Sequence, residues 1–334
     1  MTLAANLATI PTQGLMFRNR LINGEMIFAQ RQTSATFGAG ASYVLDRWYT
    51  SASIANVLNV AQVSDAPVGF QTSLRATSLA SYTPGTSQGF LIGQGIEALN
   101  CADLMWGTAN AKPVVLSFWV KASATGTYSG SARNGGTPSY IGYPFTYTIN
   151  AVNTWEYKII SIPGATTGGW GSSTNSGIWV FFDLGCGTSL RGSAGSWQAG
   201  SVLGVTGTAT PMASNGATWS VTGVQLEEGY VATEFERRLI GTELLLCQRY
   251  YATSFGNPEY HQVPAPGATY ATFYRVDLPA TMRIAPTFSP NYSASNAVLS
   301  YTYYPYNTHV MHYVSASVAT NAYMYFTWQA NADY

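Results

Sequence analysis

Polar and apolar residues alternate along several short stretches of this chain. In the segment 114–122, Leu116, Phe118 and Val120 share one face of an extended strand, because successive side chains of a strand point to opposite sides. The run 178–184 is almost wholly apolar, which is typical of a strand in a protein core. Gly, Ser and Asn separate these stretches, so the pattern predicts an all-β protein with a β-sandwich. Further strands are predicted at 143–149, 155–162, 219–227, 270–279 and 322–329, and a strand or loop at 301–306.

The segment 242–251 has a helical pattern instead. Thr242 is a suitable N-cap residue, and Glu243 and Arg249 carry the charges that favour the first and last turns. At about ten residues an isolated helix is marginal in water, so we expect packing to hold it.

Composition changes along the chain and predicts four parts. Residues 1–16 are small and weakly polar, and are expected to form an N-terminal attachment arm. Residues 17–238 form the sandwich, and 239–251 a helical linker. Residues 252–334 form a small β-domain, in a region (251–334) that holds 13 of the 23 tyrosines.

Few residues carry a charge. Charged residues make up 9% of the chain, against about 25% in ordinary globular domains, and 15 basic residues balance 15 acidic ones. A nucleic-acid-binding protein needs a basic surface to displace counterions from phosphates, so nucleic acid is not expected as a partner. A surface so poor in charge favours a subunit that is covered within an assembly.

The three cysteines, Cys101, Cys186 and Cys247, form no CxxC pattern and are expected to be buried free thiols in a protein made in a reducing compartment. The first residues lack the cationic and apolar regions of a signal peptide. No apolar run approaches the length of about 18 residues that a membrane-spanning helix needs. Neither membrane insertion nor a cofactor is therefore predicted.

Catalytic chemistry has little material in this sequence. Glycoside hydrolysis needs two carboxyl groups about 5 to 10 Å apart, whereas the adjacent Glu227 and Glu228 would face opposite sides of a strand. No internal repeat suggests a parallel β-helix. We therefore predict no enzyme and no catalytic residue. The other acidic residues considered were Asp103, Asp183 and Asp277.

Metal-binding patterns are weak as well. His309 and His312 are three residues apart and, with His261, are the chain's histidines, which we expect at the surface or in packing. No metal site is predicted, although a structural calcium near Glu25 or Asp46 stays open.

Aromatic residues are the natural candidates for binding. Aromatic faces stack on the C–H surfaces of sugars, while polar side chains fix the hydroxyl groups. The alternative is that most of these rings belong to the core or to a subunit interface. The candidate glycan-binding residues are Tyr301, Tyr303, Tyr304, Tyr306 and Trp328 in the C-terminal domain, and Trp170 and Trp197 in Gly-rich loops of the sandwich.

The run 223–238, GVQLEEGYVATEFERR, is followed by CQRYY at 247–251. Together they resemble a segment of a family of tailed-bacteriophage virion proteins, mostly tail-fibre or receptor-binding components. The opening at 19–31 and the sequence DRWY at 46–49 resemble the first strands of galactose-binding-like and carbohydrate-binding-module jelly rolls. The resemblance thus implies a jelly roll over 17–238, and the segment 278–287 resembles the entry to a small β-domain in the same family.

The same resemblance implies a function. The chain would be a non-enzymatic structural protein of the virion, assembled in the host cytoplasm. Three copies would form a fibre that binds host-surface polysaccharide through its distal domain. The N-terminal arm would contact other virion proteins. Two alternatives remain: a capsid-decorating or baseplate assembly protein with no receptor role, and a glycan-degrading tailspike.

Overall fold

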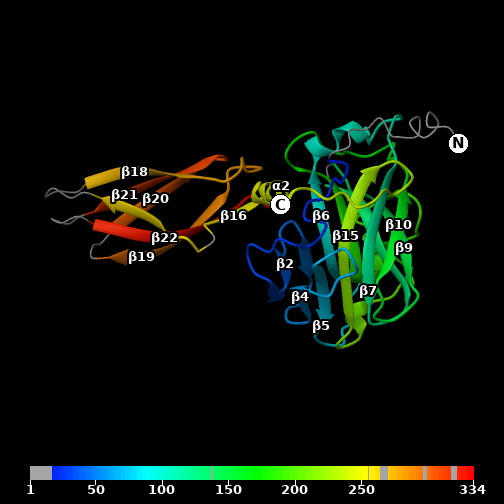
Figure 1. Ribbon diagram of the computed structural model, residues 1–334. Helices are drawn as coiled ribbons and strands as arrows, with labels where there is room; N and C mark the ends of the chain where they lie inside the picture. The colour runs from blue at the N-terminus through cyan, green and yellow to red at the C-terminus, as the bar shows by residue number, and fades with distance from the viewer. Residues whose placement is uncertain (1–16, 137, 255, 264–269, 296–298, 317–321) are drawn as a thin grey trace. The chain divides into compact units, whose positions relative to one another are not determined.

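The computed structural model describes residues 17–136, 138–254, 256–263, 270–295, 299–316 and 322–334, so the predicted arm at 1–16 lies outside the described residues. The chain forms two compact units (Figure 1). The first comprises Met1–Ile27 and Gln32–Arg238, and the second comprises Phe28–Arg31 and Leu239–Tyr334. A short N-terminal piece of the chain therefore belongs to the second unit.

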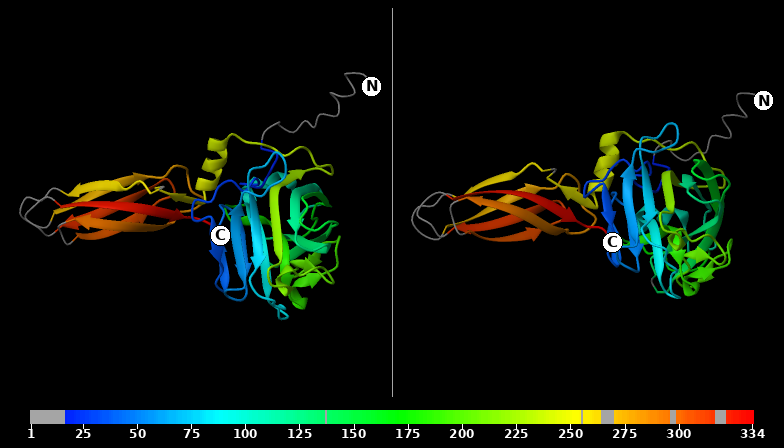
Figure 2. Two further views of the ribbon diagram at one scale, coloured as in Figure 1. Left: turned by 60° about the horizontal axis from the view of Figure 1, so that its bottom comes forward. Right: turned by 90° about the horizontal axis from the view of Figure 1, so that it is seen from below.

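Two antiparallel sheets face each other in the first unit (Figure 2). The six-stranded sheet has the order β1 (Ser34–Thr36), β4 (Leu58–Val63), β5 (Ser73–Ser78), β15 (Thr218–Glu228), β7 (Val114–Ala122), β10 (Glu156–Ile162). The seven-stranded sheet has the order β13 (Gln198–Ala199), β9 (Ile141–Ile149), β8 (Gly126–Asn134), β11 (Ser176–Cys186), β6 (Gly89–Glu97), β3 (Tyr49–Ala52), β2 (Gly40–Tyr43). The connections add a parallel pair, β12 (Arg191–Gly192) and β14 (Gly204–Val205), and the 3-10 turns η1 (Ala98–Asn100), η2 (Ala102–Leu104), η3 (Thr188–Leu190) and η4 (Pro211–Ala213).

Aromatic side chains fill the space between these sheets. The ring of Phe182 lies 5.0 Å from that of Phe118 and 5.1 Å from that of Trp219, centroid to centroid. Trp219 donates its indole N–H to the hydroxyl of Tyr147 (2.9 Å), so these two buried polar groups are paired. The first unit is a jelly-roll β-sandwich, and the predicted fold class is confirmed.

The segment that carries the sequence resemblance closes this sandwich. Glu227 accepts hydrogen bonds from the backbone N–H and the hydroxyl of Thr233, both at 2.8 Å, and so fixes the turn after β15. The Asn19 side chain accepts from Leu226 N–H (3.0 Å), and Arg238 donates to the backbone carbonyl of Asn19. These residues join the first described residues of the unit to its last strand, which is a structural role.

The second unit is a smaller pair of antiparallel sheets (Figure 2). One sheet centres on β22 (Ala322–Asn331), which pairs with β16 (Tyr251–Thr253), β17 (Glu259–Val263) and β19 (Thr287–Ser295). The other has the order β18 (Tyr270–Asp277), β21 (His309–Ala316), β20 (Leu299–Pro305), so 301–306 contributes a strand. Val310, Val314, Met324, Phe326 and Trp328 are among the residues of the core between them.

The helix α2 (Ile240–Gln248) begins earlier than predicted. Its N-cap is Leu239 and not Thr242, because the Leu239 carbonyl already accepts the helical hydrogen bond from Glu243 N–H (3.0 Å). After the helix, Tyr250 O accepts from Ala332 N–H (2.7 Å), and the guanidinium of Arg31 lies 3.6 Å from the ring centroid of Tyr251. The CQRYY segment therefore ties the separate pieces of the second unit together. Within the described residues, no helix is long and apolar enough to cross a membrane.

Candidate functional site

The four candidate tyrosines of β20 and the turn after it fall on two faces. Alternation along the strand places Tyr301 and Tyr303 on one side and Tyr304 and Tyr306 on the other, and all four are exposed. The ring of Tyr301 lies 3.8 Å from that of Tyr292, on the opposite sheet. Tyr301 and Tyr303 therefore cover the edge of the core, and a different surface holds Tyr304 and Tyr306.

That surface is the outer side of the sheet β18–β21–β20. The residues Val310, His312 and Val314 of β21 are buried, so its alternate residues, including Tyr313, point outward. Strand pairing places Phe273 beside Tyr313, with ring centroids 5.1 Å apart. We call Phe273, Tyr304, Tyr306 and Tyr313 the outer aromatic face.

The exposure of this face is high for aromatic residues. Phe273 is 59% exposed, and Tyr304 and Tyr306 are 49% and 50% exposed. The sequence prediction missed Phe273 and Tyr313, although the alternation of 270–279 placed Phe273 opposite the apolar Val276.

Polar groups border the outer aromatic face. Arg275 donates from Nε to Asp277 Oδ1 (2.6 Å), and both side chains are more than half exposed. His309 stacks on Tyr306, with ring centroids 4.8 Å apart. Exposed rings next to hydrogen-bonding groups form the kind of surface that stacks on a sugar ring and bonds its hydroxyls.

Trp328 is not part of this surface. It is 5% exposed, and its ring stacks on Phe288 in the core with centroids 5.9 Å apart. The candidate role of Trp328 in glycan binding is therefore corrected to packing. The signal was present in the sequence, since Met324, Phe326 and Trp328 form one apolar stripe of a strand.

Trp170 and Trp197 meet each other and a third ring, Trp106. The three centroid distances are 4.6 Å for Trp106–Trp170, 5.3 Å for Trp106–Trp197 and 5.4 Å for Trp170–Trp197. Each indole N–H donates to a loop carbonyl: Trp106 to Lys112, Trp170 to Thr167 and Trp197 to Pro163. Trp170 is 8% exposed and offers no open ring face, so it is corrected to a packing residue, while Trp197 is half-buried.

Two of the three histidines meet inside the second unit. His261 and His312 are buried with ring centroids 5.6 Å apart, and His312 Nε2 lies 2.9 Å from the Tyr292 hydroxyl. Burial lowers the pKa of each to about 4, and the charge of His312 adds to the effect on His261. In the described part of the chain, no three His, Cys, Asp or Glu side chains gather as metal ligands.

The acidic residues considered for catalysis are engaged elsewhere. Asp183 is buried and pairs with Arg191 (3.1 Å), and Glu25, considered for calcium, pairs with Arg237 (2.7 Å). The other acidic candidates are engaged as well: Asp103 pairs with Arg20, Glu228 with Lys112 and Asp277 with Arg275, while Glu227 fixes the turn at Thr233.

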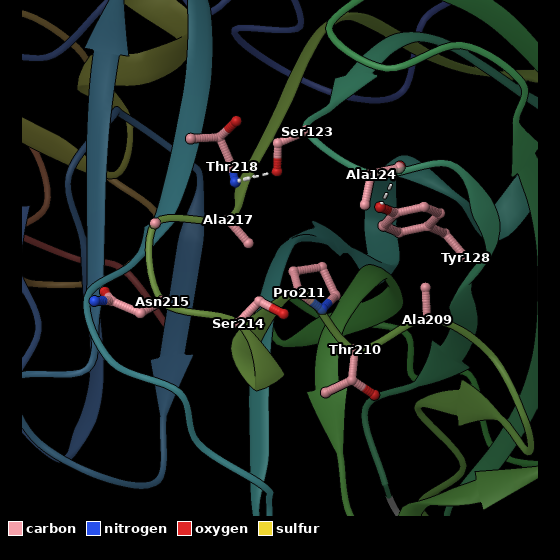
Figure 3. A pocket seen from close by; sticks show the side chains of 11 residues that line it. Ser123, Ala124, Tyr128, Ala209, Thr210, Pro211, Ser214, Asn215, Ala217 and Thr218 are labelled. Atoms are coloured by element: carbon pink, nitrogen blue, oxygen red, sulfur yellow. Dashed lines mark hydrogen bonds between the residues drawn. The ribbon is translucent and has the colours of Figure 1, made fainter.

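A pocket of about 380 Å³ lies where β7 ends, β8 begins and β15 starts (Figure 3). Ser123 Oγ accepts from Thr218 N–H (2.9 Å), and the Tyr128 hydroxyl donates to Ala124 O (2.8 Å). Its described lining holds hydroxyl and amide groups without a charged side chain. The volume suits one small neutral molecule, but Tyr128 is buried and offers no stacking surface.

Comparisons with known proteins give structural similarities at low sequence identity. No family model matches the sequence, and no curated protein matches it. A candidate sugar-binding protein from Bacteroides thetaiotaomicron is similar, with a TM-score of 0.38 and 10% identity over 63% of this chain and 100% of that one. The enzymatically active domain of a tailspike from bacteriophage CBA120 has a TM-score of 0.32 and 13% identity over 64% of this chain and 22% of that one. The CBM22-2 xylan-binding domain from Paenibacillus barcinonensis has a TM-score of 0.31 and 17% identity over 59% of this chain and 98% of that one.

Proposed function

We propose that this chain is a non-enzymatic glycan-binding protein whose outer aromatic face contacts a host-surface polysaccharide. The observation that carries the proposal is the exposure of Phe273, Tyr304 and Tyr306 on one side of a regular sheet. Strands hold these rings at fixed spacing, so little side-chain freedom is lost when a sugar stacks on them. A neutral polymer needs no strong charge from its receptor, which agrees with the zero net charge.

The setting that we propose is the fibre of a tailed bacteriophage. Its support is the sequence resemblance at 223–251. The contacts of Glu227 stabilise the first unit and those of Tyr251 the second, so these residues serve the fold of each unit and not the outer aromatic face. In this proposal the N-terminal arm attaches the subunit to other virion proteins, and three copies act together. Each stacking contact is weak, and several copies convert it into firm attachment through effective concentration.

Absence of catalysis is part of the proposal. It is supported by the engagement of the acidic residues, because Asp183 and Glu228 each face a cation and Glu227 faces a turn. A general acid needs a protonated carboxyl group that substrate can reach. Asp183 is buried out of reach, and the hydrogen bond from Arg20 lowers the pKa of the exposed Asp103.

Binding of full-length protein to purified surface polysaccharide of candidate host cells tests this function. The double variant Tyr304→Ala/Tyr306→Ala removes half of the outer aromatic face. Tyr260→Ala/Tyr325→Ala is the matched control, because these rings form an exposed pair on the other sheet of the same unit, 5.1 Å apart. We expect the first variant to bind at least about tenfold more weakly, since stacking contributes about 1 kcal/mol or more per ring, and the control to bind as the wild type.

Three results would contradict parts of the proposal. Equal binding by wild type and the Tyr304/Tyr306 variant would remove the outer aromatic face from it. Binding to virion proteins alone would favour the assembly protein, and release of reducing sugars would favour the tailspike. Light scattering tests the copy number, with three chains of 35.8 kDa expected per particle in solution.

A further inference from the structure

Arg133 lies on the outer side of the seven-stranded sheet in the first unit. It belongs to β8 and pairs with Trp179 of β11 and Gly142 of β9, on the face opposite the core residue Phe182. Its guanidinium carbon is 4.3 Å from the ring centroid of Tyr140 and 5.1 Å from that of Phe181. The cation is therefore held between two aromatic rings.

Glycines make room for both of these rings. A Cβ atom on Gly93 would lie 2.5 Å from Phe181 Cδ1, and one on Gly136 would lie 2.2 Å from Tyr140 Cε1. Gly136 also has a positive φ of 91°, which favours glycine. The two rings thus lie close against the backbone, and their positions beside Arg133 depend on these glycines.

The charge of Arg133 has no counter-charge in the described part of the chain. Nη1 donates to Ser201 Oγ (2.6 Å), and Nε is buried without a hydrogen-bond partner there. Two other arginines of the first unit do have such a partner, since Arg191 pairs with Asp183 and Arg237 with Glu25. Burial lowers the pKa of Arg133, so its environment favours the charged form less than water does.

Further aromatic rings pack next to the Arg133 side chain. The rings of Trp179 and Phe181 are nearly parallel with centroids 5.2 Å apart, and Tyr49 lies 5.3 Å from Trp179. Tyr140 is 41% exposed, so its ring can turn aside without leaving a packed core. A ligand that reaches Arg133 would meet the exposed ring of Tyr140, while Trp179 and Phe181 are buried and form the apolar surroundings of the cation.

We propose that Arg133 binds the carboxylate of an acidic sugar, at a second site separate from the outer aromatic face. Nη1 already donates to Ser201, so Nε and Nη2 form the edge whose two parallel N–H groups match two carboxylate oxygens. Nε is buried, and in this proposal the ring of Tyr140 turns aside to admit the carboxylate. The carboxylate supplies the missing counter-charge. The ring of Tyr140, which is 41% exposed, suits the C–H face of a uronic acid.

Calorimetric titration of the full chain with oligomers of galacturonate, glucuronate and mannuronate tests this site. The carboxyl-reduced form of each oligomer has the same linkage without the charge and is the ligand control. The variant Arg133→Met keeps an apolar side chain next to the two rings and removes the guanidinium group with its two parallel donors. Arg237→Met is the matched protein control, because Arg237 also lies near two rings, those of Phe70 and Phe235, but already has Glu25 as its partner.

We expect at least one acidic oligomer to bind and to lose tenfold or more in affinity, of the order of a lost bidentate pair, in Arg133→Met and after carboxyl reduction. Binding should shift the ¹⁵N resonance of the Arg133 Nε–H group. Arg237→Met should bind as the wild type, and so should Tyr304→Ala/Tyr306→Ala, which separates this site from the outer aromatic face.

Equal affinity for acidic and reduced oligomers, equal affinity of Arg133→Met and wild type, or no binding of any acidic oligomer would each overturn the proposal. If Arg133→Met does not fold, Arg133→Lys serves in its place. A lysine keeps the positive charge but lacks the two parallel N–H donors of the guanidinium group, so we expect the same loss of affinity.

Discussion

Acid should loosen the second unit through the buried pair His261 and His312. Both rings have a pKa of about 4 in the folded unit, against an ordinary value of 6.5. An unfolded chain therefore takes up these protons near pH 6.5, while the folded unit resists them until about pH 4. The stability that the neutral rings provide is complete above pH 6.5 and is lost progressively as the pH falls from 6.5 to 4.

The size of this loss follows from the two pKa values. One pKa unit corresponds to about 1.4 kcal/mol, so at pH 5 each ring costs the folded state about 2 kcal/mol relative to pH 7. The groups that contact the rings are Tyr274, Tyr292, Tyr301 and Phe326, none of which supplies a negative charge to offset a proton. Because the two rings affect each other, we expect the pair to cost about 2 to 4 kcal/mol at pH 5.

Hydrogen exchange measured by mass spectrometry at pH 7 and pH 5 is the assay, after correction for the intrinsic pH dependence of exchange. Protection in β21 and β22 should fall by roughly 30- to 900-fold at pH 5, while β7 and β11 of the first unit serve as an internal reference. The variant His261→Gln/His312→Gln should lose this pH dependence, and His309→Gln should keep it, because His309 lies outside the core. Unchanged protection at pH 5 in the wild type would refute the reasoning, as would a fall that persists in the double variant.

Two further predictions concern the first unit, and urea unfolding measures both. Asp183→Ala leaves the Arg191 side chain, 8% exposed, without its carboxylate and should cost about 3 to 5 kcal/mol. Asp103→Ala removes a carboxylate that is 52% exposed and should cost about 1 kcal/mol, and similar costs for the two variants would contradict the role of burial. Gly223→Ala should cost about 2 to 5 kcal/mol, because φ is 60° and the new Cβ would lie 2.6 Å from Phe70 Cζ. Gly216→Ala shares the positive φ (78°) but meets nothing within 4 Å, so it should cost only about 1 to 2 kcal/mol, and an equal cost for both would rule out crowding.

Much of the fold could be predicted because alternation is a local property. The strands expected at 114–122, 155–162 and 219–227 correspond to β7 (Val114–Ala122), β10 (Glu156–Ile162) and β15 (Thr218–Glu228). The prediction that the helix begins at Thr242 was wrong, because a good capping residue favours a helix start at its position but does not require one.

The candidate site was harder to predict because it depends on which strands pair. Alternation groups Tyr304 with Tyr306, but only the pairing of β18 with β21 adds Phe273 and Tyr313. Arg133 and Phe181 are 48 positions apart and meet because β8 pairs with β11. His261 and His312 meet across the core from different sheets, which no short pattern in the sequence reports.

The most direct test of the central claim is a hydrogen-exchange footprint of the full chain with and without a bound neutral host-surface polysaccharide. We expect the ligand to protect peptides of β18, β20 and β21, which carry the outer aromatic face, and to leave the exchange of β17 unchanged. Protection confined to the first unit, or to β17 and its neighbour Tyr325, would contradict it.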